Sequence, residues 1–215
     1  HVRRISWAPM FDGMFRAPID RAVKPIGNVL RKTGLSPDHL TIVGLLIAGG
    51  AAVAIGLGWL RLGLVLVILA ALPDLFDGAL AKASNLSSQR GAYFDSVVDR
   101  VTDATLFGGV AWYLASHDSP HMSLLPFAVM ALSSVISYQR AKAESLGLDA
   151  KGGLMERAER IIALCIGLLF SVLLIPLLWV MLVLTAVTAV QRFVKVWRQA
   201  AVAPVTAARI EMRRS

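Results

Sequence analysis

Apolar runs of about twenty residues recur along the chain from residue 41 onwards, and the links between them contain most of the charged residues. A helix of about 20 apolar residues is long enough to cross the hydrocarbon core of a bilayer. We therefore predict an all-α polytopic membrane protein with six transmembrane helices, at residues 41–60, 62–81, 91–115, 124–144, 161–174 and 177–196. The fifth run is the shortest.

A weaker helical pattern precedes the first span. Apolar and charged residues face opposite sides at helical spacing over residues 19–31, which is typical of an amphipathic helix on a membrane surface. Pro25 should kink this helix, and a plain basic linker is the alternative. Ser36, Pro37 and Asp38 predict the cap and first turn of the first membrane helix. The chain thus divides into a cytoplasmic segment (1–36), a six-helix domain (37–196) and a basic cytoplasmic tail (197–215).

Basic residues are unevenly distributed among the links. They gather in the first segment, in the second-to-third and fourth-to-fifth links and in the tail, whereas the other three links contain only Arg61. The positive-inside rule then places both termini in the cytoplasm, on the inner side of the cell membrane. The net charge of +8 faces anionic lipid headgroups there, so we expect membrane lipids and no nucleic acid as partners. The single cysteine, Cys165, excludes a disulfide framework.

Four aspartates interrupt two of the apolar segments. Asp74 and Asp77 lie near the inner end of the second span, and Asp95 and Asp99 lie near the inner start of the third. An ionised aspartate at membrane depth costs roughly 2.5–3.5 kcal/mol, so four of them need a compensating partner. A short link joins the two spans as an antiparallel pair, which should bring the four carboxylates to one depth. Oxygen ligands of this kind suit Mg²⁺ or Mn²⁺, and two such cations could share them.

The spacing of these acids resembles the signature of the CDP-alcohol phosphotransferases, Asp-x₂-Asp-Gly-x₂-Ala-Arg-x₈-Gly-x₃-Asp-x₃-Asp. Every position matches except one, where Lys82 replaces the usual arginine and cannot offer a bidentate fork. The resemblance implies a membrane enzyme that displaces CMP from a CDP-linked lipid, and it implies a homodimer. It also implies two divalent cations held by the four aspartates, with Asp99 as the general base. The nucleotide-lipid contacts that it implies are Asp38, Thr41, Asp74, Gly78, Lys82 and Ser88.

The acceptor alcohol must be inferred from other residues. Residues 35–38, 137–144, 152–160 and 190–192 look like those of the actinobacterial phosphatidylinositol-phosphate synthases. Arg140, Arg160 and Arg192 lie at the inner ends of three different spans, and converging guanidinium groups would bind the phosphate of a phosphorylated acceptor. This favours inositol phosphate over free inositol as the acceptor. Ordinary positive-inside residues are the alternative interpretation of each arginine.

Three other functions compete with transfer from CDP-diacylglycerol to inositol phosphate. A phosphatidylglycerophosphate synthase would use the same metals with glycerol 3-phosphate as acceptor. A divalent-cation transporter could line an ion path with the acids, although the chain shows no repeated halves. A non-catalytic lipid-binding scaffold would tolerate loss of the acids. Asp103, one turn past Asp99, could orient a basic neighbour rather than bind metal, and we assign it no role.

Overall fold

The computed structural model describes the backbone of residues 37–84 and 89–202 and the side chains of residues 38–72 and 89–201. Within these ranges the chain is helical and contains no strand. Six α-helices and one 3₁₀ turn follow one another: α2 (Pro37–Gly56), α3 (Leu60–Ser84), α4 (Gln89–His117), η1 (Pro120–Ser123), α5 (Leu124–Ser145), α6 (Arg157–Leu169) and α7 (Ser171–Val202). The predicted surface helix and residues 203–215 of the tail lie outside the described residues.

Each predicted span is covered for most of its length by one α-helix, and α2 begins at Pro37 as its cap signal predicts. Among the described residues, three segments are long and apolar enough to cross a membrane: Asp38–Gly56, Pro120–Ser145 and Ser171–Ala201. A shorter apolar helix covers Leu60–Leu72. Many large apolar side chains also point outwards along the helices, including Leu46, Val65, Val172 and Val183. These features are those of a polytopic membrane protein, and the count of six spans stays a prediction.

The predicted break between the last two spans was wrong. The predicted spans 161–174 and 177–196 leave the break at residues 175–176, but the chain turns at Phe170 and Pro176 lies inside α7. Proline is tolerated here because it is only the sixth residue of the helix, where a single intrahelical hydrogen bond is lost. Gly167 lies close to the next helix at this turn, where a Cβ atom would lie 3.3 Å from Leu174 Cα and 2.9 Å from Leu174 Cδ1.

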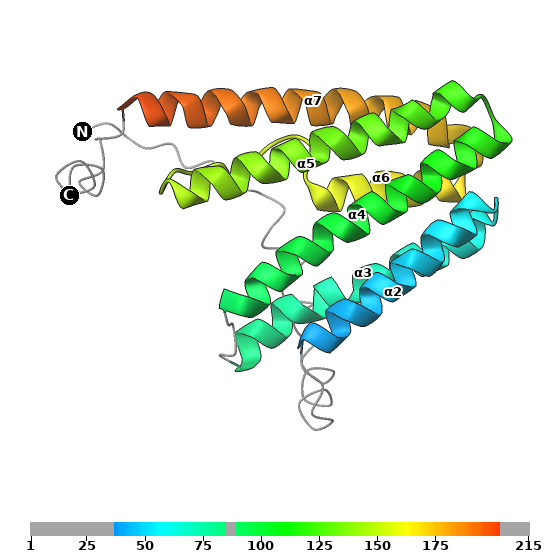
Figure 1. Cartoon of the computed structure of the whole chain (residues 1–215), viewed down its shortest axis with the longest axis horizontal. Helices are drawn as coiled ribbons and strands as arrows, with labels where there is room; N and C mark the ends of the chain where they lie inside the picture. Colours follow the sequence, from blue (N-terminus) through cyan, green and yellow to red (C-terminus); the bar gives the residue numbers. More distant parts are fainter. Residues whose placement is uncertain (1–36, 85–88, 203–215) are drawn as a thin grey trace, which may run out of the picture.

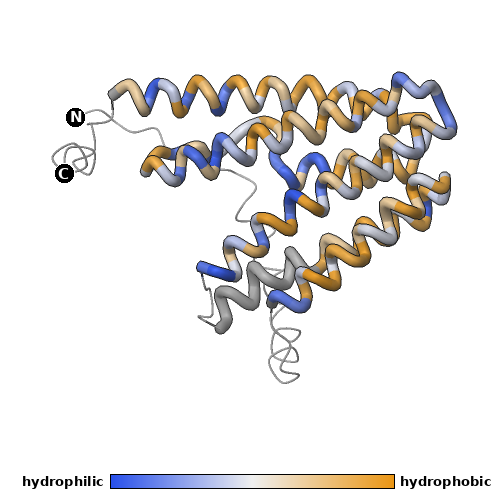
Figure 2. Tube along the Cα trace, in the orientation of Figure 1, coloured by the Kyte–Doolittle hydropathy of each residue, from blue (hydrophilic) through white to orange (hydrophobic). Residues whose placement is uncertain are grey.

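Two layers of helices position the site (Figure 1). Helix α2 packs against both α3 and α4, while α7 packs against α5 and α6. Contacts of α4 with α5 and of α3 with α6 join the two layers. The backbones of α2 and α4 approach closely at Gly109, where a Cβ atom would lie 2.6 Å from Ala52 O. Buried apolar side chains such as Phe107, Leu164 and Leu178 form one continuous core, and apolar residues dominate the helices away from their ends (Figure 2).

Candidate active site

Three aspartates lie on successive turns of one face of α4, at Asp95, Asp99 and Asp103. Residues four apart on a helix are surface neighbours, so these carboxylates form one row. Their burial increases along the helix. Asp95 is exposed, the Asp99 side chain is 20% exposed, and the Asp103 side chain is 6% exposed. The accessible end of the row therefore belongs to the two residues of the predicted metal set.

The other half of that set belongs to α3. Positions 74, 77, 78 and 82 fall within the last turns of this helix, but their side chains lie outside the described residues, as does all of Ser88. Helix α3 ends at Ser84 and α4 begins at Gln89, so both acidic segments lie at the same end of the molecule (Figure 1). Among the described side chains, no three His, Cys, Asp or Glu residues gather around a common point. The convergence of all four aspartates stays a prediction.

The start of α2 lies at this same end (Figure 1). Asp38 is the second residue of the helix and is partly exposed, whereas Thr41 is buried. These two predicted nucleotide contacts are therefore brought to the end of the molecule where α3 ends and α4 begins.

Two arginines of α6 form ion pairs with the row of acids on α4. Arg157 Nη1 lies 2.8 Å from Asp99 Oδ1, and Arg157 Nε donates to Asp103 Oδ1 at 3.2 Å. Arg160 Nη2 donates to Asp103 Oδ2 at 3.1 Å. Arg100, on α4 itself, lies 3.5 Å from Asp99 and donates to Ser137 on α5. The structure thus joins α4, α5 and α6 through one network of charged side chains.

Arg192 on α7 lies in a second buried cluster. Its guanidinium donates to Ile136 O at 3.1 Å and to Gly152 O at 3.0 Å, and it lies 3.4 Å from Glu156 Oε1. The charges of Arg140 and Arg160 both act on Arg192, so the three predicted phosphate-binding arginines lie in one region. They differ in environment, however. Arg160 and Arg192 are buried, whereas Arg140 is exposed and pairs with Glu144 on its own helix.

The Nε atoms of Arg160 and Arg192 are buried and have no hydrogen-bond acceptor within the described part of the chain. Buried donors in proteins are nearly always satisfied, so these two atoms need an acceptor that the described residues do not supply. Two of the three predicted phosphate-binding arginines therefore have donor capacity left after their contacts within the protein.

The loop between α5 and α6 is fastened to α7. Thr188 Oγ1 accepts from the backbone nitrogens of Leu154 and Met155 at 3.1 and 3.0 Å. Lys195 Nζ lies 2.9 Å from Asp149 Oδ2 and lowers the pKa of that carboxyl. At the end of the loop, Glu156 and Glu159 form a reciprocal capping box that fixes the start of α6. These contacts fix the segment that carries Arg157 and Arg160.

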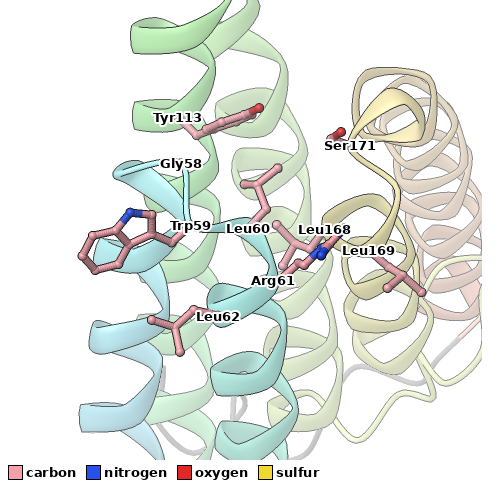
Figure 3. A pocket seen from close by; sticks show the side chains of 9 residues that line it. All are labelled: Gly58, Trp59, Leu60, Arg61, Leu62, Tyr113, Leu168, Leu169 and Ser171. Carbon is pink, nitrogen blue, oxygen red and sulfur yellow. The ribbon is translucent and has the colours of Figure 1, made fainter.

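A cavity of about 510 Å³ lies beside the α2–α3 turn (Figure 3), at the opposite end of the helices from the α3–α4 connection (Figure 1). Its walls come from the α2–α3 turn, Tyr113 and the α6–α7 turn, and the side chain of Arg61 enters the space between α3 and α6. None of the predicted site residues lines it. The cavity is therefore separate from the candidate active site.

A family model described as CDP-alcohol phosphatidyltransferase matches residues 35–197. The chain belongs to this family. It is 34% identical over 206 residues to a phosphatidylinositol phosphate synthase of Streptomyces avermitilis, covering 89% of this chain and 84% of that protein. It is 35% identical over 189 residues to a protein of the same name from Mycolicibacterium smegmatis, covering 83% and 85% of the two chains.

Solved structures of the phosphatidylinositol phosphate synthase of Mycobacterium tuberculosis share this fold. One contains bound CDP-DAG and superposes with a TM-score of 0.79 at 31% identity, covering 86% of this chain and 99% of the other. A second, in complex with manganese and citrate, gives the same TM-score and identity and covers 86% and 93%. The resemblance of the aspartate spacing to this family is thus confirmed.

Sequence reasoning missed the partners that hold the site of this CDP-alcohol phosphatidyltransferase together. Arg157 was considered only as a supporting charge, and Arg100 was not considered. The available signal was the i, i+3 spacing of Arg157 and Arg160 at the start of a helix, which places two cations on one face. Nothing in that spacing identifies an acid 54 residues away on another helix as their partner.

Proposed function

We propose that this chain transfers the phosphatidyl group of CDP-diacylglycerol to a hydroxyl of inositol phosphate, releasing CMP. The observation that carries the proposal is the contact of Arg157 with both Asp99 and Asp103. This contact places the cationic start of α6 against the acidic face of α4. A phosphorylated acceptor needs cations beside the reacting centre, and a nucleotide-diphosphate donor needs acids that can hold divalent metal. The names and bound ligands of the relatives support the same activity.

Two divalent cations, Mg²⁺ or Mn²⁺, suit the residues at the accessible end of the acidic row. Asp95 and Asp99 present hard oxygen ligands one turn apart, and we assign Asp74 and Asp77 to the same ions. The manganese-bound relative supports this assignment. When bound, such ions neutralise the pyrophosphate of the donor and the charge that develops on the departing CMP.

Asp99 is the proposed general base. The oxygen of the acceptor hydroxyl bonds to the phosphorus that carries diacylglycerol, the bond from that phosphorus to the oxygen of CMP breaks, and Asp99 takes the hydroxyl proton. Its side chain is partly exposed, and the contact with Arg157 fixes its orientation. Asp38, Thr41, Asp74, Gly78, Lys82 and Ser88 are the residues that we assign to the nucleotide-lipid.

Buried Arg160 and buried Arg192 are proposed ligands of the acceptor phosphate, and exposed Arg140 is the third. The buried Nε donors of the first two support this role, because a phosphate oxygen could accept from them. Such a site favours inositol phosphate over an uncharged polyol. We further propose six membrane spans, a homodimer, and an active site and termini that face the cytoplasm at the cell membrane.

The test is CMP release by purified protein with CDP-diacylglycerol, Mg²⁺ and a panel of acceptors. We expect release to require the metal and to be stimulated by inositol phosphate more than by free inositol. Release with glycerol 3-phosphate alone would refute the assigned acceptor and indicate a phosphatidylglycerophosphate synthase. Divalent-ion flux in proteoliposomes without any nucleotide lipid, and no CMP release, would refute transfer altogether.

A further inference from the structure

Asp103 is the most buried acid of the α4 row and the only one of the three outside the predicted metal set. Its two carboxylate oxygens bind different cations, Oδ1 accepting from Arg157 Nε and Oδ2 from Arg160 Nη2. The side chains of Asp103 and Arg160 are 6% and 3% exposed. Both oxygens accept from guanidinium groups inside the protein, so the charge of Asp103 is already compensated without a divalent cation.

The two arginines need this partner. Both lie in the first turns of α6, where the positive end of the helix dipole disfavours cations. Arg160 also experiences the repulsive charges of Arg100 and Arg157. The negative charge of Asp103 offsets these unfavourable terms, and a neutral side chain at this position would not.

We propose that Asp103 is a positioning residue that holds Arg157 and Arg160 in place for the phosphate of the acceptor. Arg157 contacts both Asp103 and Asp99, so the same carboxylate fixes the cation beside the proposed base. Asp103 itself touches neither substrate nor metal. The inference rests on the proposed function for the identity of the acceptor, but it requires only that the acceptor carry a phosphate.

The experiment compares Asp103→Asn with the matched control Asp118→Asn, which removes an exposed acid just beyond the other end of α4. We expect the KM for inositol phosphate to rise about tenfold or more in Asp103→Asn, because the arginines lose their charged anchor. The KM for CDP-diacylglycerol and the half-saturating Mg²⁺ concentration should stay within about twofold of wild type. Asp118→Asn should leave all three unchanged.

Two results would overturn the proposal. If the half-saturating Mg²⁺ concentration of Asp103→Asn rises as much as its acceptor KM, Asp103 is a metal ligand. If every KM is unchanged and kcat falls only in proportion to the folded fraction of the protein, the role of Asp103 is purely structural. If Asp103→Asn does not fold, Asp103→Glu and Arg157→Gln carry the test, because the first keeps the charge and the second keeps the buried Asp103–Arg160 pair. Each should raise the KM for the acceptor more than the KM for CDP-diacylglycerol, and Arg157→Gln should also lower kcat because it loses the contact with Asp99. An unchanged acceptor KM in both variants refutes the role.

Failure of the proposed function is distinguishable from failure of this inference. If wild type uses only glycerol 3-phosphate, the assigned acceptor is wrong and the same KM comparison is made with that substrate. If wild type releases no CMP with either, protection against thermal unfolding by inorganic phosphate is measured instead. Protection of wild type that Asp103→Glu and Arg157→Gln both weaken supports the inference, and equal protection of all three contradicts it.

Discussion

Substitution of glycine at the contact between α2 and α4 tests how strongly the site depends on close packing of the two backbones. A Cβ atom at Gly109 would lie 2.6 Å from both the Cα and the carbonyl oxygen of Ala52, whereas one at Gly108 would meet nothing within 4 Å. Because the atoms facing Gly109 are backbone atoms, they cannot rotate away. We therefore expect Gly109→Ala to push α2 from α4 by several tenths of an ångström, and Gly108→Ala to change nothing in the packing.

Comparison with Gly108→Ala isolates the free-energy cost of overpacking at Gly109. Both substitutions gain the same helix propensity, about 0.5–1 kcal/mol for alanine over glycine. Only Gly109→Ala also incurs overpacking, which typically costs about 1–3 kcal/mol. The difference in unfolding free energy between the two variants should therefore be about 1–3 kcal/mol, with Gly108→Ala the more stable. In a chain of this size that corresponds to a separation on the order of 2–12 °C in Tm.

The assay is thermal unfolding of both variants in the same detergent, followed by CMP release at a temperature where both are folded. The displacement of α2 also moves Asp38 and Thr41 relative to the acids of α4, so we expect Gly109→Ala to raise the KM for CDP-diacylglycerol while Gly108→Ala does not. Equal Tm shifts in the two variants would refute the close approach of the backbones.

Three further predictions concern the base, the loop and acid stability. Asp99→Asn should lower kcat by at least about 10²–10⁴-fold while CDP-diacylglycerol still binds, and retained turnover would remove Asp99 as the base. Thr188→Val should lower the unfolding free energy by about 1–3 kcal/mol, because two backbone donors lose their acceptor. The matched variant Thr105→Val, which loses only a bond to its own helix, should stay within about 0.5 kcal/mol in the same denaturation assay. The pKa of Asp149 is lowered from 3.8 by Lys195, so its stabilisation is present above that pH and lost only as the pH falls through the lower folded value. Asp149→Asn should therefore lower Tm by more at pH 7, where the exposed ion pair contributes its full but small stabilisation, than near pH 3, where part of that stabilisation is lost; an equal Tm change at both would contradict the assignment.

The positions of the helices could be predicted from the sequence because a membrane helix needs a long apolar run, and such runs are visible without knowledge of the fold. The turn at Phe170 could not. A proline is a general signal for a helix end, whereas the observed turn accompanies the close approach of Leu174 to Gly167 on α6. That contact exists only after the two helices have met, and no periodicity in the chain records it.

The same distinction applies to the site. The spacing of Asp95 and Asp99 is a local property of one helix, so the sequence is sufficient to place them on one face. Which cation Asp103 binds is a property of the packing of α6 on the rest of the bundle, and 54 residues separate it from Arg157. The prediction that Arg140, Arg160 and Arg192 share one region depended on topology alone. Their difference in burial depended on tertiary packing and was not foreseen.

The gradient of burial along α4 explains why three similar acids can have different roles. Asp95 is accessible, so its charge can be compensated by a ligand that arrives from outside. Asp103 is enclosed, and an enclosed charge must be paired within the protein because removing a partner costs several kcal/mol. Asp99 lies between these limits, in contact with Arg157 yet partly exposed. A general base needs this intermediate position, since it must be oriented by the protein and still reach the hydroxyl of the acceptor.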